Sequence, residues 1–155
     1  MRSSYESSVN SHIAGKFGEH TCYGLLTRKF NIATDPVYLD ENRLGEADLL
    51  CHGLRIDVKT RQEAFWDEFG RALAVSQWDS LRKKADIVFW CTFQPGEQAS
   101  GCWKGWNWIS DFDDVEPVWT VLGRHRVLNR KLPSNSVRSI EEFVALIANI
   151  SFVNS

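Results

Sequence analysis

The feature that most constrains the fold is an apolar run from Ile87 to Phe93, which contains no charged residue. A run of this length and composition is typical of a β-strand that is buried on both faces. It is far too short to cross a lipid bilayer. We therefore expect a sheet whose central strand is covered by other elements on either side.

The hydrophobic periodicity around this strand predicts a mixed order of helices and strands. We expect a first helix from Asn10 or Ser11 to about Phe30, a helix capped by Ser76 that runs to about Lys84, and a last helix opened by a capping box at 139–142. Strands are expected at 37–39, 46–51, 54–60, 72–75, 102–109 and 118–122, while 62–70 fits either a loop or a short helix. This order predicts an α/β fold with a mixed central β-sheet flanked by helices.

Length and charge set further limits on the function. The chain has 155 residues, which fits a single domain (1–155) whose segment 1–10 is expected to be flexible. There are 18 Lys and Arg residues against 20 Asp and Glu residues, a net charge of -2. This balance argues mildly against a nucleic-acid coat protein, but it does not exclude an enzyme whose acidic residues gather in one metal-binding pocket.

Cysteine spacing and the absence of a targeting signal indicate the compartment. Cys22, Cys51, Cys91 and Cys102 form no CxxC pair, so we expect neither a zinc site nor disulfides, and we interpret all four as buried thiols. The N-terminal residues contain no apolar signal core. We therefore expect a cytoplasmic protein with no membrane partner.

The segment from Glu46 to Lys59 contains the most informative chemistry. His52-Gly53 suits a two-residue hairpin turn, because glycine takes positive φ freely and histidine tolerates it. In that register Asp48 lies opposite Asp57 and Glu46 lies opposite Lys59. Period-two alternation then places these four charged residues on one face. It places the apolar residues of the hairpin, from Ala47 to Val58, on the other face.

Two aspartates directly opposite each other repel unless a cation lies between them. Carboxylate ligands without His or Cys favour Mg²⁺ or Mn²⁺ over Zn²⁺. Lys59 lies two residues from Asp57 and could contact whatever the metal binds. Such a set suits phosphodiester hydrolysis, where a water is activated and charge on the phosphate oxygens is stabilised. The alternative is a solvated sheet face with ordinary charges, since an acid-x-Lys triplet is common by chance.

The pattern resembles a known family. Asp48, the run Ile56-Asp57-Val58-Lys59, a preceding helix with Gly18-Glu19, and a later Gln77 followed by Ala85-Asp86-Ile87-Val88-Phe89 look like the PD-(D/E)xK nuclease superfamily, over residues 11–93. The later Gly105-Trp106 strand is also similar. The sequence departs from the family pattern at position 47, where alanine precedes Asp48 in place of proline.

The resemblance implies a restriction-endonuclease-like fold and assigns roles to single residues. Asp48 and Asp57, with the Val58 carbonyl, would hold one or two Mg²⁺ or Mn²⁺ ions, and Lys59 would assist the attacking water. Glu19 would be a further ligand or would position the water. Gln77 would match a polar active-site residue seen in some branches of the family.

The expected function is therefore metal-dependent hydrolysis of DNA phosphodiesters, with an endonuclease of junction-resolvase, restriction or repair type as the expected kind. One site cuts one strand, so double-strand cutting would require a homodimer or sequential nicking. A non-catalytic nucleic-acid-binding domain and a nuclease acting on RNA are the alternatives.

Other features carry less weight. His20, His52 and His125 are interpreted as surface or structural residues in preference to general bases. Trp106 and Trp108 could form a base-stacking platform, although core packing is the favoured role. The densest basic cluster contains Arg124, Arg126, Arg130 and Lys131, and it fits a solvated face and a phosphate-contact patch equally well.

Overall fold

The structure, a computed structural model, describes the chain over residues 4–96, 100–122 and 124–153. Its helices are α1 (Ser4–Gly24), α2 (Trp66–Phe69), α3 (Val75–Lys84) and α4 (Ile140–Val153). Its strands are β1 (Leu49–Cys51), β2 (Leu54–Gln62), β3 (Ala72–Ala74), β4 (Ile87–Gln94), β5 (Ser100–Trp108), β6 (Val118–Leu122) and β7 (His125–Lys131). Leu25–Lys29 continues α1 as a π-helix. The predicted α/β class with a mixed sheet is confirmed.

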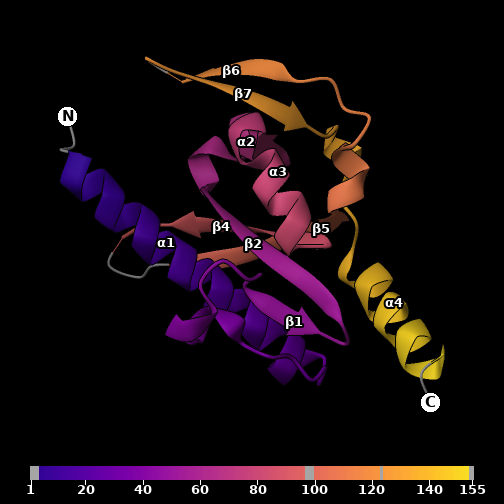
Figure 1. Cartoon of the computed structure of the whole chain (residues 1–155). Helices are drawn as coiled ribbons and strands as arrows, with labels where there is room; N and C mark the ends of the chain where they lie inside the picture. Colours follow the sequence, from indigo (N-terminus) through magenta and orange to yellow (C-terminus); the bar gives the residue numbers. More distant parts are fainter. Residues whose placement is uncertain (1–3, 97–99, 123, 154–155) are drawn as a thin grey trace.

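The strands form two sheets (Figure 1). In the larger sheet the order is β1-β2-β4-β5, where β2 and β4 run parallel and the two outer pairs run antiparallel. In the smaller sheet the order is β3-β7-β6, and both pairs are antiparallel. Pairing of β3 with β7 joins residues 72–74 to residues 129–131, so the smaller sheet lies beside α2 and α3.

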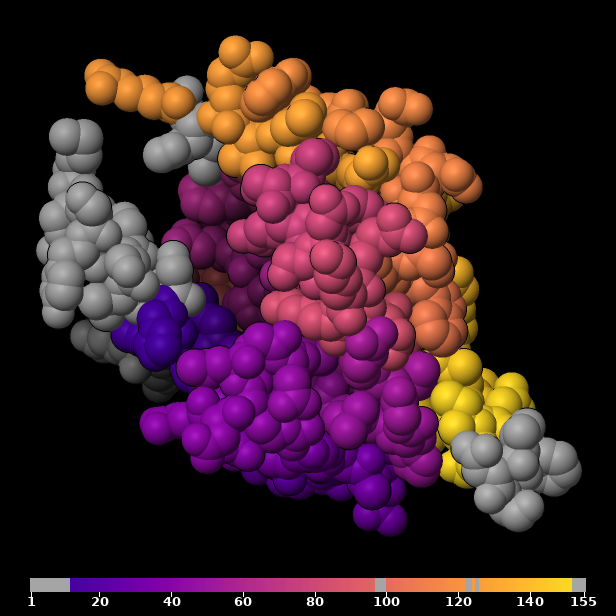
Figure 2. Space-filling view, in the orientation of Figure 1, coloured from indigo at the N-terminus to yellow at the C-terminus, as the bar shows by residue number. Residues whose placement is uncertain are grey.

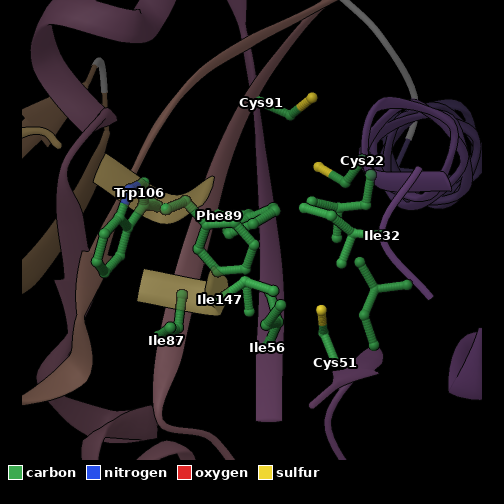
Figure 3. Packing of buried hydrophobic residues seen from close by; sticks show 12 residues of the cluster. Cys22, Ile32, Cys51, Ile56, Ile87, Phe89, Cys91, Trp106 and Ile147 are labelled. Carbon is green, nitrogen blue, oxygen red and sulfur yellow. The ribbon is translucent and has the colours of Figure 1, made fainter. Parts of the chain in front are cut away.

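Every residue of β4 except its last is buried, which confirms the prediction from the apolar run. Ile87, Phe89 and Cys91 pack with side chains of α1 and α4 in one hydrophobic cluster, shown in Figure 3. Val88 and Trp90 pack with α3 and β3 in a second cluster. The larger sheet is therefore the middle layer between two apolar cores.

Helix α1 packs closely against the sheet at Gly18. A Cβ atom at this position would lie 1.9 Å from Oγ1 of Thr60 on β2, so a larger side chain would force the two elements apart. Only glycine allows this contact without a shift. The contact brings the next residue of the helix, Glu19, against the same sheet.

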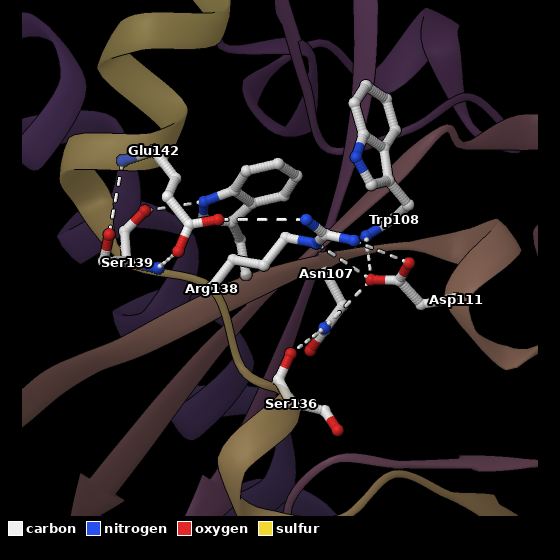
Figure 4. Close-up of polar contacts among 8 residues, drawn as sticks. Asn107, Trp108, Asp111, Ser136, Arg138, Ser139 and Glu142 are labelled. Atoms are coloured by element: carbon white, nitrogen blue, oxygen red, sulfur yellow. Dashed lines mark hydrogen bonds and ion pairs between the residues drawn. The ribbon is translucent and has the colours of Figure 1, made fainter.

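A polar network attaches the chain beyond β5 to the core (Figure 4). Asp111 accepts a hydrogen bond from the Asn107 amide at 3.1 Å and pairs with the Arg138 guanidinium at 3.0 Å. Asn107 is fully buried and also accepts a bond from Trp90 Nε1 at 2.9 Å. Since these groups satisfy one another, the segment before α4 is fixed against β5 at low desolvation cost.

Several predicted elements are confirmed and others are wrong at their ends. The capping box is present, because Ser139 N–H donates to Glu142 and Glu142 N–H donates to Ser139. Helix α3 ends at Lys84 as expected, but its N-cap is Ala74 and not Ser76. The strand expected at 118–122 is β6, whereas β7 was not assigned from the sequence.

The first helix begins at Ser4, so the expected start at Asn10 or Ser11 is wrong, while the flexibility of 1–10 stays a prediction. The segment 37–39 is a 3-10 helix in place of the expected strand, because it follows the turn at Pro36 and bonds back to it. Strand β1 is shorter than the expected 46–51.

The four cysteines are free thiols, but Cys102 is exposed and not buried. Among the described residues no helix combines the length and apolar character needed to cross a membrane.

Candidate functional site

The β1–β2 hairpin has the turn and the register that its sequence predicts. His52 and Gly53 both have positive φ, at 50° and 82°. The paired residues are Leu49 with Ile56 and Cys51 with Leu54. The residue sum across each pair is the predicted one, but the ladder ends at Leu49, before the predicted pairing of Asp48 with Asp57.

Asp48 lies at the point where the β1–β2 ladder stops. Its Oδ2 accepts a hydrogen bond from the backbone N–H of Val58 at 2.7 Å, in the place where a further ladder bond would have formed. The N–H and C=O of one strand residue point to the same side. The carbonyl of Val58 therefore faces the edge that Asp48 occupies.

Asp57 carries a buried carboxylate between two lysines. Its side chain is 3% exposed, and its Oδ2 and Oδ1 lie 3.1 Å from Lys59 Nζ and 3.4 Å from Lys84 Nζ. The contact with Lys59 is a close ion pair without an aligned hydrogen bond, since Oδ2 finds no hydrogen-bond partner among the described residues. Of the two lysines, Lys59 therefore makes the shorter contact with the Asp57 carboxylate.

Two details of the predicted hairpin faces are wrong. Glu46 does not pair with Lys59, because it forms an ion pair with Arg43 at 3.1 Å. Ala47 packs in the second hydrophobic cluster, away from Leu49 and Ile56 in the first. Both differences have one cause: regular strand geometry begins only at Leu49, so the alternation does not extend to 46–48.

Glu19 reaches the same region from α1. Its side chain is 16% exposed, and Oε2 is buried with no hydrogen-bond partner in the described part of the chain. The Nζ atom of Lys16 lies 3.8 Å from this oxygen. The carboxylate therefore has little compensation for its loss of water.

The carboxylates raise one another's affinity for protons. Burial raises the pKa of Glu19 from 4.5 to about 7, and the negative charge of Asp48 adds to this effect. Burial also raises the pKa of Asp48 from 3.8 to about 6, with the charge of Asp57 as the next cause and the bond from Val58 N–H opposing it. Groups with pKa values raised in this way are frequent at functional sites.

The donor set fits a hard divalent cation in its chemistry. It consists of carboxylate oxygens, of which Glu19 Oε2 and Asp57 Oδ2 are buried with no hydrogen-bond partner among the described residues. The side chains are not gathered into a finished centre, because no group of three His, Cys, Asp or Glu in the described residues has the spacing of a metal site. Binding of a cation here would require these carboxylates to converge, with Asp57 exchanging its lysines for the ion.

Gln77 lies apart from the carboxylates. It lines a cavity of about 420 Å³ together with Lys59, and none of Asp48, Asp57 and Glu19 lines that cavity. Lys59 therefore belongs to both regions. The structure brings together Glu19, Asp48, Asp57 and Lys59, and it connects Gln77 to them only through the cavity.

The sequence offered Arg61 and the Arg82 to Lys84 run only as possible DNA contacts, and it did not place Arg61 and Lys84 beside the carboxylates. Helix α3 is the crossover between the parallel strands β2 and β4, whose register pairs Asp57 with Val88. A crossover helix returns to the start of the next strand, so the end of α3 could have been placed beside Asp57 from this topology. Arg61 is half-buried, and its guanidinium donates to the carbonyls of Phe69 and Ala72.

The basic cluster is only partly free to contact a ligand. Arg130 donates to the carbonyl of Val115 at 2.7 Å, and Lys131 donates to the carbonyl of Asp67 at 2.6 Å. These two residues hold the smaller sheet in place. Arg124 and Arg126 are exposed, and Arg126 lies 4.8 Å from the ring centroid of Trp119.

The remaining aromatic and histidine residues have structural contacts. Trp106 is buried and its Nε1 donates to the carbonyl of Ser139, which confirms core packing. His20 contacts the Tyr38 hydroxyl, and His52 Nδ1 lies 3.3 Å from Ser151 Oγ. The side chain of His125 lies outside the described residues.

Comparisons with protein-family models, with curated proteins and with solved structures find no match to this chain. The resemblance to PD-(D/E)xK nucleases therefore stays a prediction from the residues named above.

The raised pKa of Glu19 predicts how stability depends on pH. The folded protein holds this proton up to about pH 7, whereas the unfolded chain releases it near 4.5. The stabilisation is complete below the unfolded pKa and is lost as pH rises through about 7. In chelator at pH 8, Glu19→Gln should therefore raise the free energy of unfolding by roughly 1 to 3 kcal/mol, measured by urea denaturation.

At pH 4 the same variant should match the wild type, because both states of the wild type are then protonated. Glu116→Gln, at an exposed glutamate, is the control and should have no effect at either pH. A stability difference between Glu19→Gln and wild type that does not vary with pH would contradict the electrostatic account.

Proposed function

We propose that the protein is a metal-dependent nuclease that hydrolyses DNA phosphodiester bonds, with a restriction-endonuclease-like fold. The observation that carries the proposal is the Asp48–Asp57 pair, in which two carboxylates of one hairpin lie together beside the ammonium of Lys59. A solvated charged face would rarely keep an aspartate that is 3% exposed. Mg²⁺ or Mn²⁺ is the expected cofactor, with one or two ions at each site.

The proposed role of each side chain in hydrolysis follows from its position in the site. Asp48, Asp57 and the Val58 carbonyl would hold the cation, and Glu19 would bind it or orient the water. A cation bound there would lower the pKa of a water ligand and neutralise charge on the phosphate. Lys59 would orient that water, whose oxygen bonds to phosphorus as one P–O ester bond breaks. The products are a phosphate monoester and a hydroxyl group.

A non-catalytic nucleic-acid-binding domain is the second candidate. One observation favours it: Lys59 and Lys84 already neutralise Asp57, and such an ion-pair network needs no metal. The two candidates differ in what they predict for a cleavage assay. A nuclease acting on RNA shares the same site and differs only in the substrate.

Cleavage should depend on the cation and on Asp57. Incubation of the protein with linear duplex, branched and single-stranded DNA, and with RNA, in Mg²⁺ or Mn²⁺ should yield cut products that chelator abolishes. Asp57→Asn should reduce the rate below detection, because it removes a ligand charge from the site. The substrate panel separates DNA from RNA. Normal turnover by Asp57→Asn would contradict the site, and no cleavage of any substrate would favour the second candidate.

Lys59 should act on the rate more than on binding. We expect Lys59→Ala to lower kcat by about 100-fold or more while the Kd for DNA, measured in chelator, changes little. Lys104→Ala is the matched control, since Lys104 is likewise a lysine in an ion pair, with Glu63 at 3.2 Å. Equal rates for the two variants would show that Lys59 serves only as the ion-pair partner of Asp57.

A further inference from the structure

The cavity next to Lys59 lies between elements that are far apart in the sequence. Its walls come from β2, the α2 region, β3 and β7, with Ala14 of α1 at its border. In Figure 2 the surface is hollowed between α1, in indigo, and the α2–α3 region, in magenta and pink. Its volume of about 420 Å³ falls in the range of small-molecule sites. It is much too small for a duplex.

The lining combines aromatic rings with side-chain amides. Phe65 and Phe69 are half-buried aromatic residues of this lining, and Gln62, Gln77 and Asn129 contribute amides. A flat heteroaromatic ligand can stack on such rings. Amides offer a donor and an acceptor in one plane, which suits the edge of a nucleobase.

Asn129, which lines the cavity, has a side-chain amide donor without a hydrogen-bond partner among the described residues. The residue is 4% exposed, and its Nδ2 is buried without a hydrogen-bond partner within the described residues. An unpaired buried donor costs roughly 1 to 3 kcal/mol, so its presence in a strand calls for an explanation. Nδ2 is closed to solvent in this structure, so the side chain would have to rotate into the cavity before an acceptor atom of a ligand could pair with it.

The charge of the lining is positive. It includes Arg61 and Lys59, of which Lys59 is already paired with Asp57 at 3.1 Å, and no acidic side chain occurs among the described residues that form it. The Arg61 guanidinium is bonded to backbone carbonyls, so it supplies positive charge without a carboxylate partner in the part of the chain described. A ligand that couples a heteroaromatic ring to an anionic group therefore fits the whole lining.

We propose that this cavity binds one unpaired nucleotide of the DNA strand, beside the proposed hydrolytic site. The inference rests on the proposed nuclease function and adds the substrate class to it. A base inside a duplex is stacked and uses its Watson–Crick edge, so it can reach the amides only when it is out of the stack. The preferred substrate is consequently single-stranded, branched or frayed DNA, and not continuous duplex.

The test measures binding without cleavage. Single-stranded DNA carrying one 2-aminopurine, the same DNA in a duplex with that base left unpaired, and the fully paired duplex are each titrated with protein in chelator. We expect the two unpaired forms to bind about tenfold or more tightly than the paired duplex, with a change in 2-aminopurine fluorescence as the base stacks on an aromatic ring. Equal affinity for all three forms would overturn the proposal.

Two variants report on the cavity itself. Gln62→Leu should weaken binding of the unpaired forms about five- to tenfold, whereas Gln94→Leu, at an exposed glutamine outside the cavity, should not. Asn129→Leu should weaken binding in the same way while the Tm stays equal or rises, because the unpaired donor is gone. Loss of stability without loss of affinity in Asn129→Leu would assign the residue to the fold and overturn its part in binding.

These outcomes are separate from those of the cleavage assay. Cleavage of all DNA forms at equal rates, with no preference in binding, would retain the nuclease and reject the nucleotide cavity. Binding of unpaired DNA without cleavage in Mg²⁺ or Mn²⁺ would reject the nuclease and identify a single-strand-binding domain.

Discussion

The buried carboxylate of Asp57 is the constraint on which the site depends. It lies at 3% exposure on the central part of β2, and such a charge requires compensation from its surroundings. Lys59 comes from the same strand and Lys84 from the end of α3, so the compensation joins two elements of the fold. Asp48 and Glu19 lie in the same region, and burial, reinforced by the negative charge of the neighbouring carboxylates, raises the pKa of both.

The packing of the sheet keeps these charges together. Helix α1 contacts β2 at Gly18, where no larger side chain fits without a shift, and this fixes Glu19 on the sheet. On the other face, Trp78 and Leu81 of α3 are buried against Val88 and Trp90, which fixes Lys84. The packing of the two hydrophobic cores thus holds the charged side chains of α1 and α3 next to the β1–β2 hairpin. The smaller sheet closes the neighbouring cavity through Asn129.

The parts of the structure that depend on local sequence could be predicted. Turn chemistry at His52-Gly53 and alternation along the strands gave the hairpin register, and the Ile87–Phe93 run indicated the central strand. The place of Glu19 followed only from a family resemblance, since the α1–β2 contact is not local. Lys84, β7 and the cavity depend on pairing between distant segments, such as residues 72–74 with 129–131, for which the sequence carries no local signal.

The proposed nuclease requires that the carboxylates of this site hold a divalent cation. Titration of the protein with Mn²⁺, followed by the loss of the free-ion electron paramagnetic resonance signal, measures this directly and needs no substrate. The account predicts one or two bound ions per chain, competition by Mg²⁺, and loss of binding in Asp48→Asn and Asp57→Asn, while Asp113→Asn binds as wild type. Failure of the protein to bind Mn²⁺ at millimolar concentrations, or equal binding by all three variants, would contradict it.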